Sequence, residues 1–253
     1  MKKFLCLVLA LLMMSFALVS CNDEGGDDTA ETSAPHVAPK YSDIDLSKIE
    51  SLDGVEITSE ATDYVLIDVK DHGKILVRLF PDVAPATVAN FKKLVAEGAY
   101  DGLIFHRVID NFMIQGGGFE QGASIIDEDE PIKADTIKGE FTSNGFVNNL
   151  KHKRGVLSMA RLGNDPNSAS NQFFICHKTS GVEHLDGDYA SFGYVVYGIE
   201  VVDDIADVKT DSADQPTKDV VITSIKFAKV TKTAPSTDSD TETGEATTET
   251  SAS

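Results

Sequence analysis

Between residues 61 and 230 the chain is a succession of short apolar runs, each bounded by turn-forming residues. Runs of roughly four to eight residues that are rich in Val, Ile and Phe and end in Gly, Pro, Asn or Asp are typical of β-strands. Helical spacing of apolar residues occurs at 85–98 and 199–206, and Pro85 suits a first helical turn. So many short strands favour one antiparallel sandwich or barrel, and periodicity does not decide between the two. Strands are expected at 64–69, 74–80, 105–109, 112–115, 155–160, 172–176, 192–196 and 220–227.

One strand pair in this series, residues 105–118, carries polar side chains among its apolar ones and ends in three glycines. A guanidinium from Arg107 and a carboxamide from Gln115 are expected to converge on one wall, beside Phe112 and Met113. Such a wall suits a neutral, partly apolar molecule that is held by one polar contact. Strand alternation puts Phe105, Arg107 and Ile109 on one face and His106 and Val108 on the other.

The first residues have the pattern of an export signal. Lys2 and Lys3 precede an apolar run at 4–19, which ends in the sequence Leu-Val-Ser-Cys. This ending resembles a bacterial lipobox, in which Cys21 becomes the first mature residue and is lipidated on its sulfur. The sequence therefore predicts an exported protein that is anchored to the cell membrane through Cys21. The alternative is an ordinary cleaved signal with a cysteine there by chance.

Two acidic segments flank the apolar part. We expect residues 22–60 to be a flexible tether and residues 231–253 a disordered tail, because Thr, Ser, Asp and Glu dominate and there is little apolar surface to bury. The formal net charge of the whole chain is −19, and cleavage of the signal makes it more negative. This charge argues against nucleic acid as a partner and against electrostatic binding to an anionic membrane, so attachment rests on the lipid.

The few thiols and imidazoles show no pattern typical of a disulfide or a metal site. Cys6 is removed with the signal and Cys21 carries the lipid, which leaves Cys176 alone in an apolar run. We expect Cys176 to be a small buried hydrophobe. The histidines lack metal-ligand spacing, so we expect neither metal nor cofactor.

Three motifs in this order, FHRVI…FMIQGG, GVLSMA and QFFI, followed by LDG and FG, resemble the cyclophilin family of peptidyl-prolyl isomerases, in its bacterial branch. The similarity covers about residues 63–230. It implies a closed eight-stranded antiparallel barrel with a helix over each end, and an isomerase domain that occupies residues 61–230.

The same resemblance implies a role for each motif residue. Arg107 is the main catalytic group, with Gln115 and Phe112 in the same site. The residues that are expected to bind the proline-containing substrate are His106, Met113, Ala160, Arg161, Gln172, Phe174, His184, Leu185 and Tyr189. Three positions depart from better-known members: His184 replaces a Trp, Tyr189 a His, and Arg161 an Asn.

We therefore expect a monomeric peptidyl-prolyl isomerase that acts on proline-containing exported proteins. Arg107 would favour the twisted amide by donating to the proline nitrogen, over an apolar pocket. The alternative is a chaperone or scaffold module that binds proline segments with little turnover. If the family resemblance is set aside, the simplest interpretation is that Arg107 is a surface ion-pair partner and that Phe112 and Phe174 are ordinary core residues.

Overall fold

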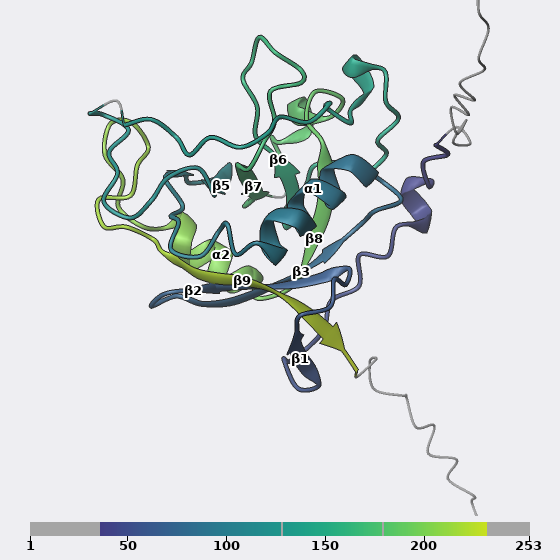
Figure 1. Cartoon of the computed structure of the whole chain (residues 1–253), viewed down its shortest axis with the longest axis horizontal. Helices are drawn as coiled ribbons and strands as arrows, with labels where there is room; N and C mark the ends of the chain where they lie inside the picture. Colours follow the sequence, from purple (N-terminus) through teal and green to yellow (C-terminus); the bar gives the residue numbers. More distant parts are fainter. Residues whose placement is uncertain (1–35, 128, 179, 232–253) are drawn as a thin grey trace, which may run out of the picture. The chain divides into compact units, whose positions relative to one another are not determined.

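One antiparallel sheet organises the chain from Val37 onward, and its strands follow the order β1-β9-β2-β3-β8-β6-β7-β5-β4 (Figure 1). The structure is a computed structural model that describes residues 36–127, 129–178 and 180–231. The strands are β1 Val55–Thr58, β2 Tyr64–Val69, β3 Gly73–Leu79, β4 Arg107–Ile109, β5 Met113–Gly116, β6 Val156–Met159, β7 Phe173–Cys176, β8 Ser191–Tyr197 and β9 Ile222–Val230. The helices are α1 Pro85–Ala96 and α2 Ile199–Ala206, with short 3-10 turns at Tyr41–Asp43, Thr142–Asn144 and Glu183–Leu185.

This architecture confirms a mainly β, antiparallel fold with two α-helices in the described residues, as the cyclophilin-like prediction required. The strands β2 to β9 correspond to the eight runs expected from the sequence. Closure of the sheet into a barrel stays a prediction. Strand β4 begins at Arg107, two residues later than expected, and this difference matters for the site.

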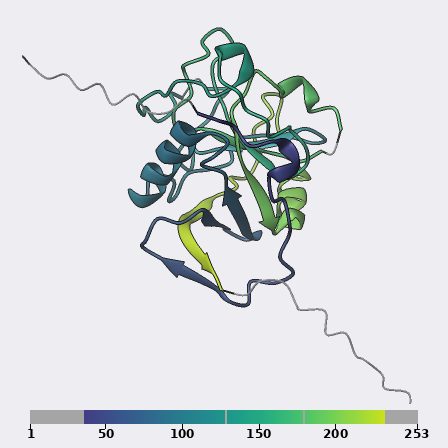
Figure 2. The same ribbon diagram turned by 90° about the vertical axis from the view of Figure 1, so that its right-hand side faces the viewer.

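Helix α1 lies beside the sheet (Figure 2), and aromatic side chains join the two. Phe91 of α1 lies 5.6 Å from Phe173 of β7, edge to face, and 5.2 Å from Phe192 of β8. Tyr100 and Phe105 also contact Phe173 edge to face. Because side chains alternate along a strand, this inward Phe173 sends the next residue, Phe174, to the opposite face.

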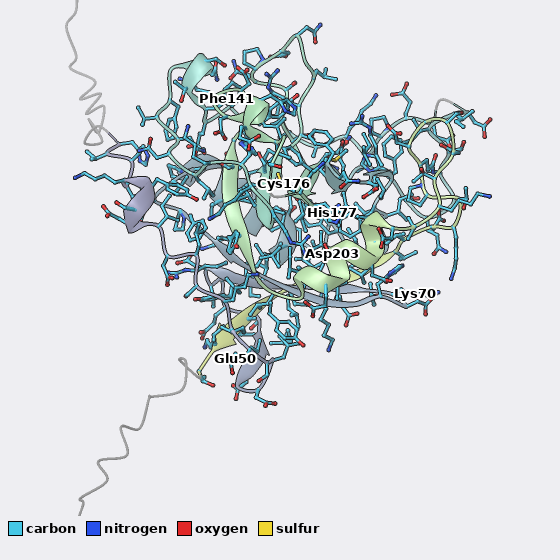
Figure 3. All side chains as sticks on the ribbon, turned by 180° about the vertical axis from the view of Figure 1, so that it is seen from behind. Glu50, Lys70, Phe141, Cys176, His177 and Asp203 are labelled. Atoms are coloured by element: carbon cyan, nitrogen blue, oxygen red, sulfur yellow. The ribbon has the colours of Figure 1, made fainter. Side chains whose placement is uncertain are left out.

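Helix α2 is tied to the end of β7 by charged groups (Figure 3). Asp203 of α2 forms an ion pair with Arg154 and accepts from His177 Nε2 at 3.1 Å. Arg154 also donates to the main-chain oxygen of His177 at 2.9 Å. The hydrogen bond from Arg154 is the main reason that the pKa of Asp203 lies below its ordinary value.

Residues 37–60 are expected to be tether, and the structure instead makes them part of the folded unit. Strand β1 pairs with β9 in the register Val55↔Val230. Asn149 Nδ2 donates to the main-chain oxygen of Pro39, and the Ile49 amide donates to Val196, both at 2.9 Å. We call this segment the strap. Its apolar residues were missed because each stands alone between polar residues or glycine in an acidic segment: Ile44, Leu46, Ile49, Leu52 and Val55.

The remaining predictions for the ends of the chain fall outside the described residues. These are the signal at 1–21 with Cys21, the tether at 22–35 and the tail at 232–253. In the part that the structure describes, no helix combines the length and apolar character that crossing a membrane requires.

Removing one buried strap side chain should destabilise the whole domain. Ile44 is 9% exposed against the main core. We expect Ile44→Ala to lower the free energy of unfolding by about 2 kcal/mol, the low end for a buried Ile because the site lies at the rim. Urea denaturation measures this. Ile57→Ala is the matched control, because Ile57 of β1 is 56% exposed and its loss should change stability by less than about 0.5 kcal/mol. A loss of less than about 0.5 kcal/mol in Ile44→Ala would contradict the prediction, because it would show that burial of this strap side chain does not stabilise the domain.

Candidate active site

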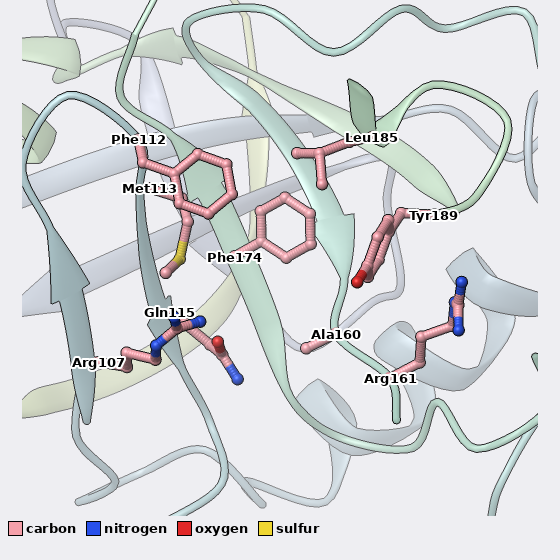
Figure 4. A pocket seen from close by; sticks show the side chains of 9 residues that line it. All are labelled: Arg107, Phe112, Met113, Gln115, Ala160, Arg161, Phe174, Leu185 and Tyr189. Carbon is pink, nitrogen blue, oxygen red and sulfur yellow. The ribbon is translucent and has the colours of Figure 1, made fainter. Parts of the chain in front are cut away.

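A hollow of about 250 Å³ opens beside β5 and β7, where polar groups and aromatic rings face one another (Figure 4). Its walls come from five separate parts of the sequence, which the sheet brings together. All of its lining residues are among those predicted from the sequence. They are Arg107, Phe112, Met113, Gln115, Ala160, Arg161, Phe174, Leu185 and Tyr189.

Strand register places the polar groups together. In the β4–β5 ladder Arg107 lies opposite Gln115, and in the β5–β7 ladder Gln115 lies opposite Phe174. Directly opposite residues share one face of a sheet, so a guanidinium, a carboxamide and a phenyl ring stand side by side. The neighbouring residue Val108 turns to the main core instead.

Phe105 does not share the face of Arg107, so that part of the alternation was wrong. Residues 105 and 106 precede the β4 ladder, and the Phe105 amide donates to Val220 at 2.9 Å. The ring of Phe105 enters the main core against Phe173. A Cβ at Gly116 would come within 2.9 Å of that ring, so the glycine permits this close approach.

Arg107 is held loosely by a residue far along the chain. Its Nε lies 3.5 Å from Asp214 Oδ2, and the two side chains are 41% and 44% exposed. The Asp214 main-chain oxygen also accepts from the Val108 amide at 2.8 Å. So exposed a pair adds little stability, and it orients the guanidinium without neutralising it closely. Asp214 was missed because no motif marks its polar loop.

Gln172 supports the site from behind and does not line the hollow. Gln115 Nε2 donates to Gln172 Oε1 at 2.9 Å. The Gln172 side chain fills the space beside Gly118, where an added Cβ would come within 2.5 Å of it. The glycine at 118 therefore allows the two carboxamides to meet, which fixes the direction of Gln115.

The apolar half of the hollow is a dry floor with two aromatic walls. Met113, Phe174 and Leu185 are 2%, 4% and 4% exposed and belong to one hydrophobic cluster. Tyr189 meets Phe174 edge to face at 5.9 Å. Phe112 stacks on His184 at 5.6 Å, so His184 supports a wall without lining the hollow. The floor is thus closely packed and little exposed to solvent.

Cys176 belongs to the same cluster and is fully buried. Burial raises the pKa of its thiol to about 12, so the group stays protonated. This agrees with its prediction as a small buried hydrophobe.

A buried polar chain behind Phe174 was not predicted. His152 Nδ1 lies 2.9 Å from Asp186 Oδ1, and its Nε2 lies 3.0 Å from Ser158 Oγ. The imidazole is stacked on Phe174 with its centroid at 6.1 Å. Because Ser158 and His152 are 0% and 3% exposed, no substrate reaches this Asp–His–Ser group. It serves to join β6 to the loop that carries Leu185.

His106 lies beside the site but is closed off from the hollow. It is 2% exposed and its ring centroid is 4.6 Å from that of Phe119. Burial lowers the pKa of the imidazole to about 4, so His106 is neutral at pH 7. Across the described ranges, no group of three or more His, Cys, Asp or Glu residues is placed to hold a metal ion.

Comparison of the sequence with known proteins points to one family. The family model for cyclophilin type peptidyl-prolyl cis-trans isomerases matches residues 64–227. Peptidyl-prolyl cis-trans isomerase B of Escherichia coli is 42% identical over 169 residues, which cover 63% of this chain and 96% of that protein. The isomerase of Acinetobacter baylyi is 38% identical over 187 residues, 71% of this chain and 94% of that protein.

The fold is similar to that of a solved cyclophilin type isomerase of Cryptosporidium parvum, crystallised in the presence of the dipeptide Ala-Pro. The TM-score is 0.54 at 31% sequence identity, and the match covers 65% of this chain and 98% of that one.

The buried imidazole of His106 should make stability depend on pH. Its folded pKa of about 4 lies below the ordinary 6.5, so between these values the unfolded state binds more protons. The free energy of unfolding should therefore fall as the pH falls from 6.5 to 4, by about 3 kcal/mol in all from this group. Urea titrations at several pH values in this range measure the free energy of unfolding. It should change less with pH in His106→Gln than in the wild type. A residual slope is expected, because burial lowers the pKa of His152 too; identical slopes would contradict the prediction.

Proposed function

Since this chain belongs to the cyclophilin type peptidyl-prolyl cis-trans isomerases, we propose that the hollow at β5 and β7 rotates X–Pro peptide bonds in exported proteins, with Arg107 as the main catalytic group. The observation that carries this proposal is the meeting of the exposed Arg107 guanidinium with an apolar floor in a single hollow. It suits a substrate whose ring is apolar and whose amide needs one polar contact.

The reaction makes and breaks no covalent bond. Amide resonance sets a rotation barrier of roughly 18–20 kcal/mol, and in the twisted state the proline nitrogen regains its lone pair. A donor directed at that nitrogen binds the twisted state better than either planar state, and such differential binding lowers the barrier. A thousandfold acceleration requires only about 4 kcal/mol.

Arg107 meets the requirements for this donor. A guanidinium is charged at every physiological pH and donates in a fixed geometry. Asp214 at 3.5 Å and Gln115 across the ladder limit its orientation. Gln115, itself held by Gln172, would bind the substrate backbone next to the turning bond.

The floor explains how the ring is held while the amide turns. Met113, Phe174 and Leu185 would enclose the pyrrolidine, and Phe112 would close the pocket from one side. Water that stabilises the planar amide is excluded from such a floor. Ala160 lies on the open side, where the peptide backbone would pass, between the floor and Arg161 (Figure 4).

Replacing Arg107 should remove most of the acceleration. We expect Arg107→Ala to lower kcat/KM for a proline tetrapeptide by about a hundredfold, as when one preorganised donor is lost. Arg78→Ala is the matched control, because Arg78 also pairs with an aspartate, Asp45, away from the hollow. It should keep its turnover. Unchanged turnover in Arg107→Ala would refute this role, and tight peptide binding without turnover in the wild type would favour a proline-binding scaffold.

We also infer that the enzyme acts outside the cytoplasm as a lipoprotein and a monomer. The lipobox-like ending at Cys21 supports this, and residues 22–35 would link the anchor to the strap. Because Asn149 binds the main-chain oxygen of Pro39, a linker that starts at Cys21 would end near residue 39 and be shorter than the tether predicted for 22–60. Proline-containing exported proteins would be its substrates.

The anchor can be tested directly. Cys21→Ala should move the protein from the membrane fraction to the soluble fraction of fractionated cells, because the acyl chains supply the membrane affinity. Labelling with a clickable palmitate analogue should mark the wild type and spare the variant. Cys176→Ala, which removes the buried thiol, should stay labelled and membrane-bound. A labelled Cys21→Ala protein would exclude this anchor.

A further inference from the structure

Arg161 stands on the rim of the hollow across the apolar floor from Arg107 (Figure 4). The arginines Arg78, Arg107 and Arg154 each pair with an aspartate. By contrast, no carboxylate of the described residues lies within ion-pair distance of Arg161. An unneutralised guanidinium at the mouth of a binding site is notable in a chain with a net charge of −19.

The guanidinium of Arg161 has donors to spare. Its Nε donates to the main-chain oxygen of Asp188 at 2.8 Å. Its Nη1 donates to Leu162 and Gly163, at 2.9 and 3.1 Å. A guanidinium has five N–H groups, and these bonds use the one on Nε and both on Nη1. Within the described part of the chain, the two on Nη2 meet no acceptor.

The charge is also held in one place. The guanidinium lies 4.8 Å from the ring centre of Tyr189 and 5.2 Å from that of Phe141. The carboxylate of Asp188 accepts from Ser143 Oγ at 2.6 Å instead of pairing with the arginine. Binding a ligand to a side chain that is already fixed loses less conformational entropy than binding to a free one.

We propose that Arg161 binds an aspartate or glutamate side chain near the substrate proline, so that the enzyme prefers acidic proline segments. This inference rests on the proposed function and names its substrate class. A free N–H group on Nη2 can donate to a carboxylate oxygen, and a hydrogen bond between two charged groups is stronger than one between neutral groups. The acidic loop around Asp127 and Asp129 would favour the opposite, basic substrates, through the long-range field of the surface. A fixed donor in contact with the peptide should outweigh a distant, screened charge.

The test compares matched peptides around one proline, with Glu, Gln or Lys placed in turn at each flanking position. NMR exchange spectroscopy gives kcat/KM for each. We expect a Glu-to-Gln ratio of about two to five at one or more positions at low salt, the range of an exposed ion pair. High NaCl should reduce it. In Arg161→Gln the ratio should approach 1, whereas Arg161→Lys, which keeps the charge, should retain part of it.

The matched control is Lys218→Gln. It removes one positive charge from an 86% exposed side chain that lines a different hollow, and it should keep the wild-type ratio. A wild-type ratio of 1 at every position, an unchanged ratio in Arg161→Gln, or a preference for Lys would each overturn the inference.

Failure of the proposed function would look different. The Gln peptide measures isomerisation without the charge, so acceleration of that peptide with no preference for Glu refutes this inference alone. If no peptide were accelerated, the proposed function would fail, and the ratio of dissociation constants from NMR titration would still test Arg161.

Discussion

The whole site depends on the two faces of β7. Phe173 enters the aromatic core between α1 and the sheet, which sends Phe174 outward as the floor of the hollow. Because the ladder with β5 pairs Phe174 with Gln115, and the next ladder pairs Gln115 with Arg107, that one orientation sets all three. A register slip of one residue would exchange the faces and remove the site.

Around Arg107, Gln115 and Phe174, the apolar floor is held firmly by its neighbours, whereas the guanidinium is more exposed and less constrained. The floor is buried and supported from behind by His152, whose polar partners Asp186 and Ser158 are also largely out of solvent. The guanidinium of Arg107 is half exposed, with Asp214 as a loose partner. A reaction in which the carbonyl turns while the ring is held suits a fixed ring pocket beside a charged donor that can reach the proline nitrogen.

The motifs were sufficient to predict which residues line the hollow, because they carry the family resemblance; strand alternation alone predicted only Arg107 and Gln115 beside Phe112 and Met113. They could not show Asp214 or the chain from Asp186 through His152 to Ser158, since these contacts join loops that no periodicity relates. Nor could they show that His106, Gln172 and His184 stand behind the walls. The strap was missed for a different reason: its apolar residues dock irregularly, and composition suggested disorder.

Charge adds a final constraint. The acidic surface attracts cations as counter-ions, and a carboxylate in close contact with an arginine at the hollow would offset its charge. A positive group that is to act on a substrate must therefore be kept from the protein's own carboxylates. Arg107 forms only a loose, half-exposed pair with Asp214 at 3.5 Å. Arg161 is held by carbonyl oxygens and aromatic rings, none of which neutralises it. The guanidinium of Arg161 is thus positioned by neutral acceptors, and the loose pair with Asp214 offsets the charge of Arg107 only in part.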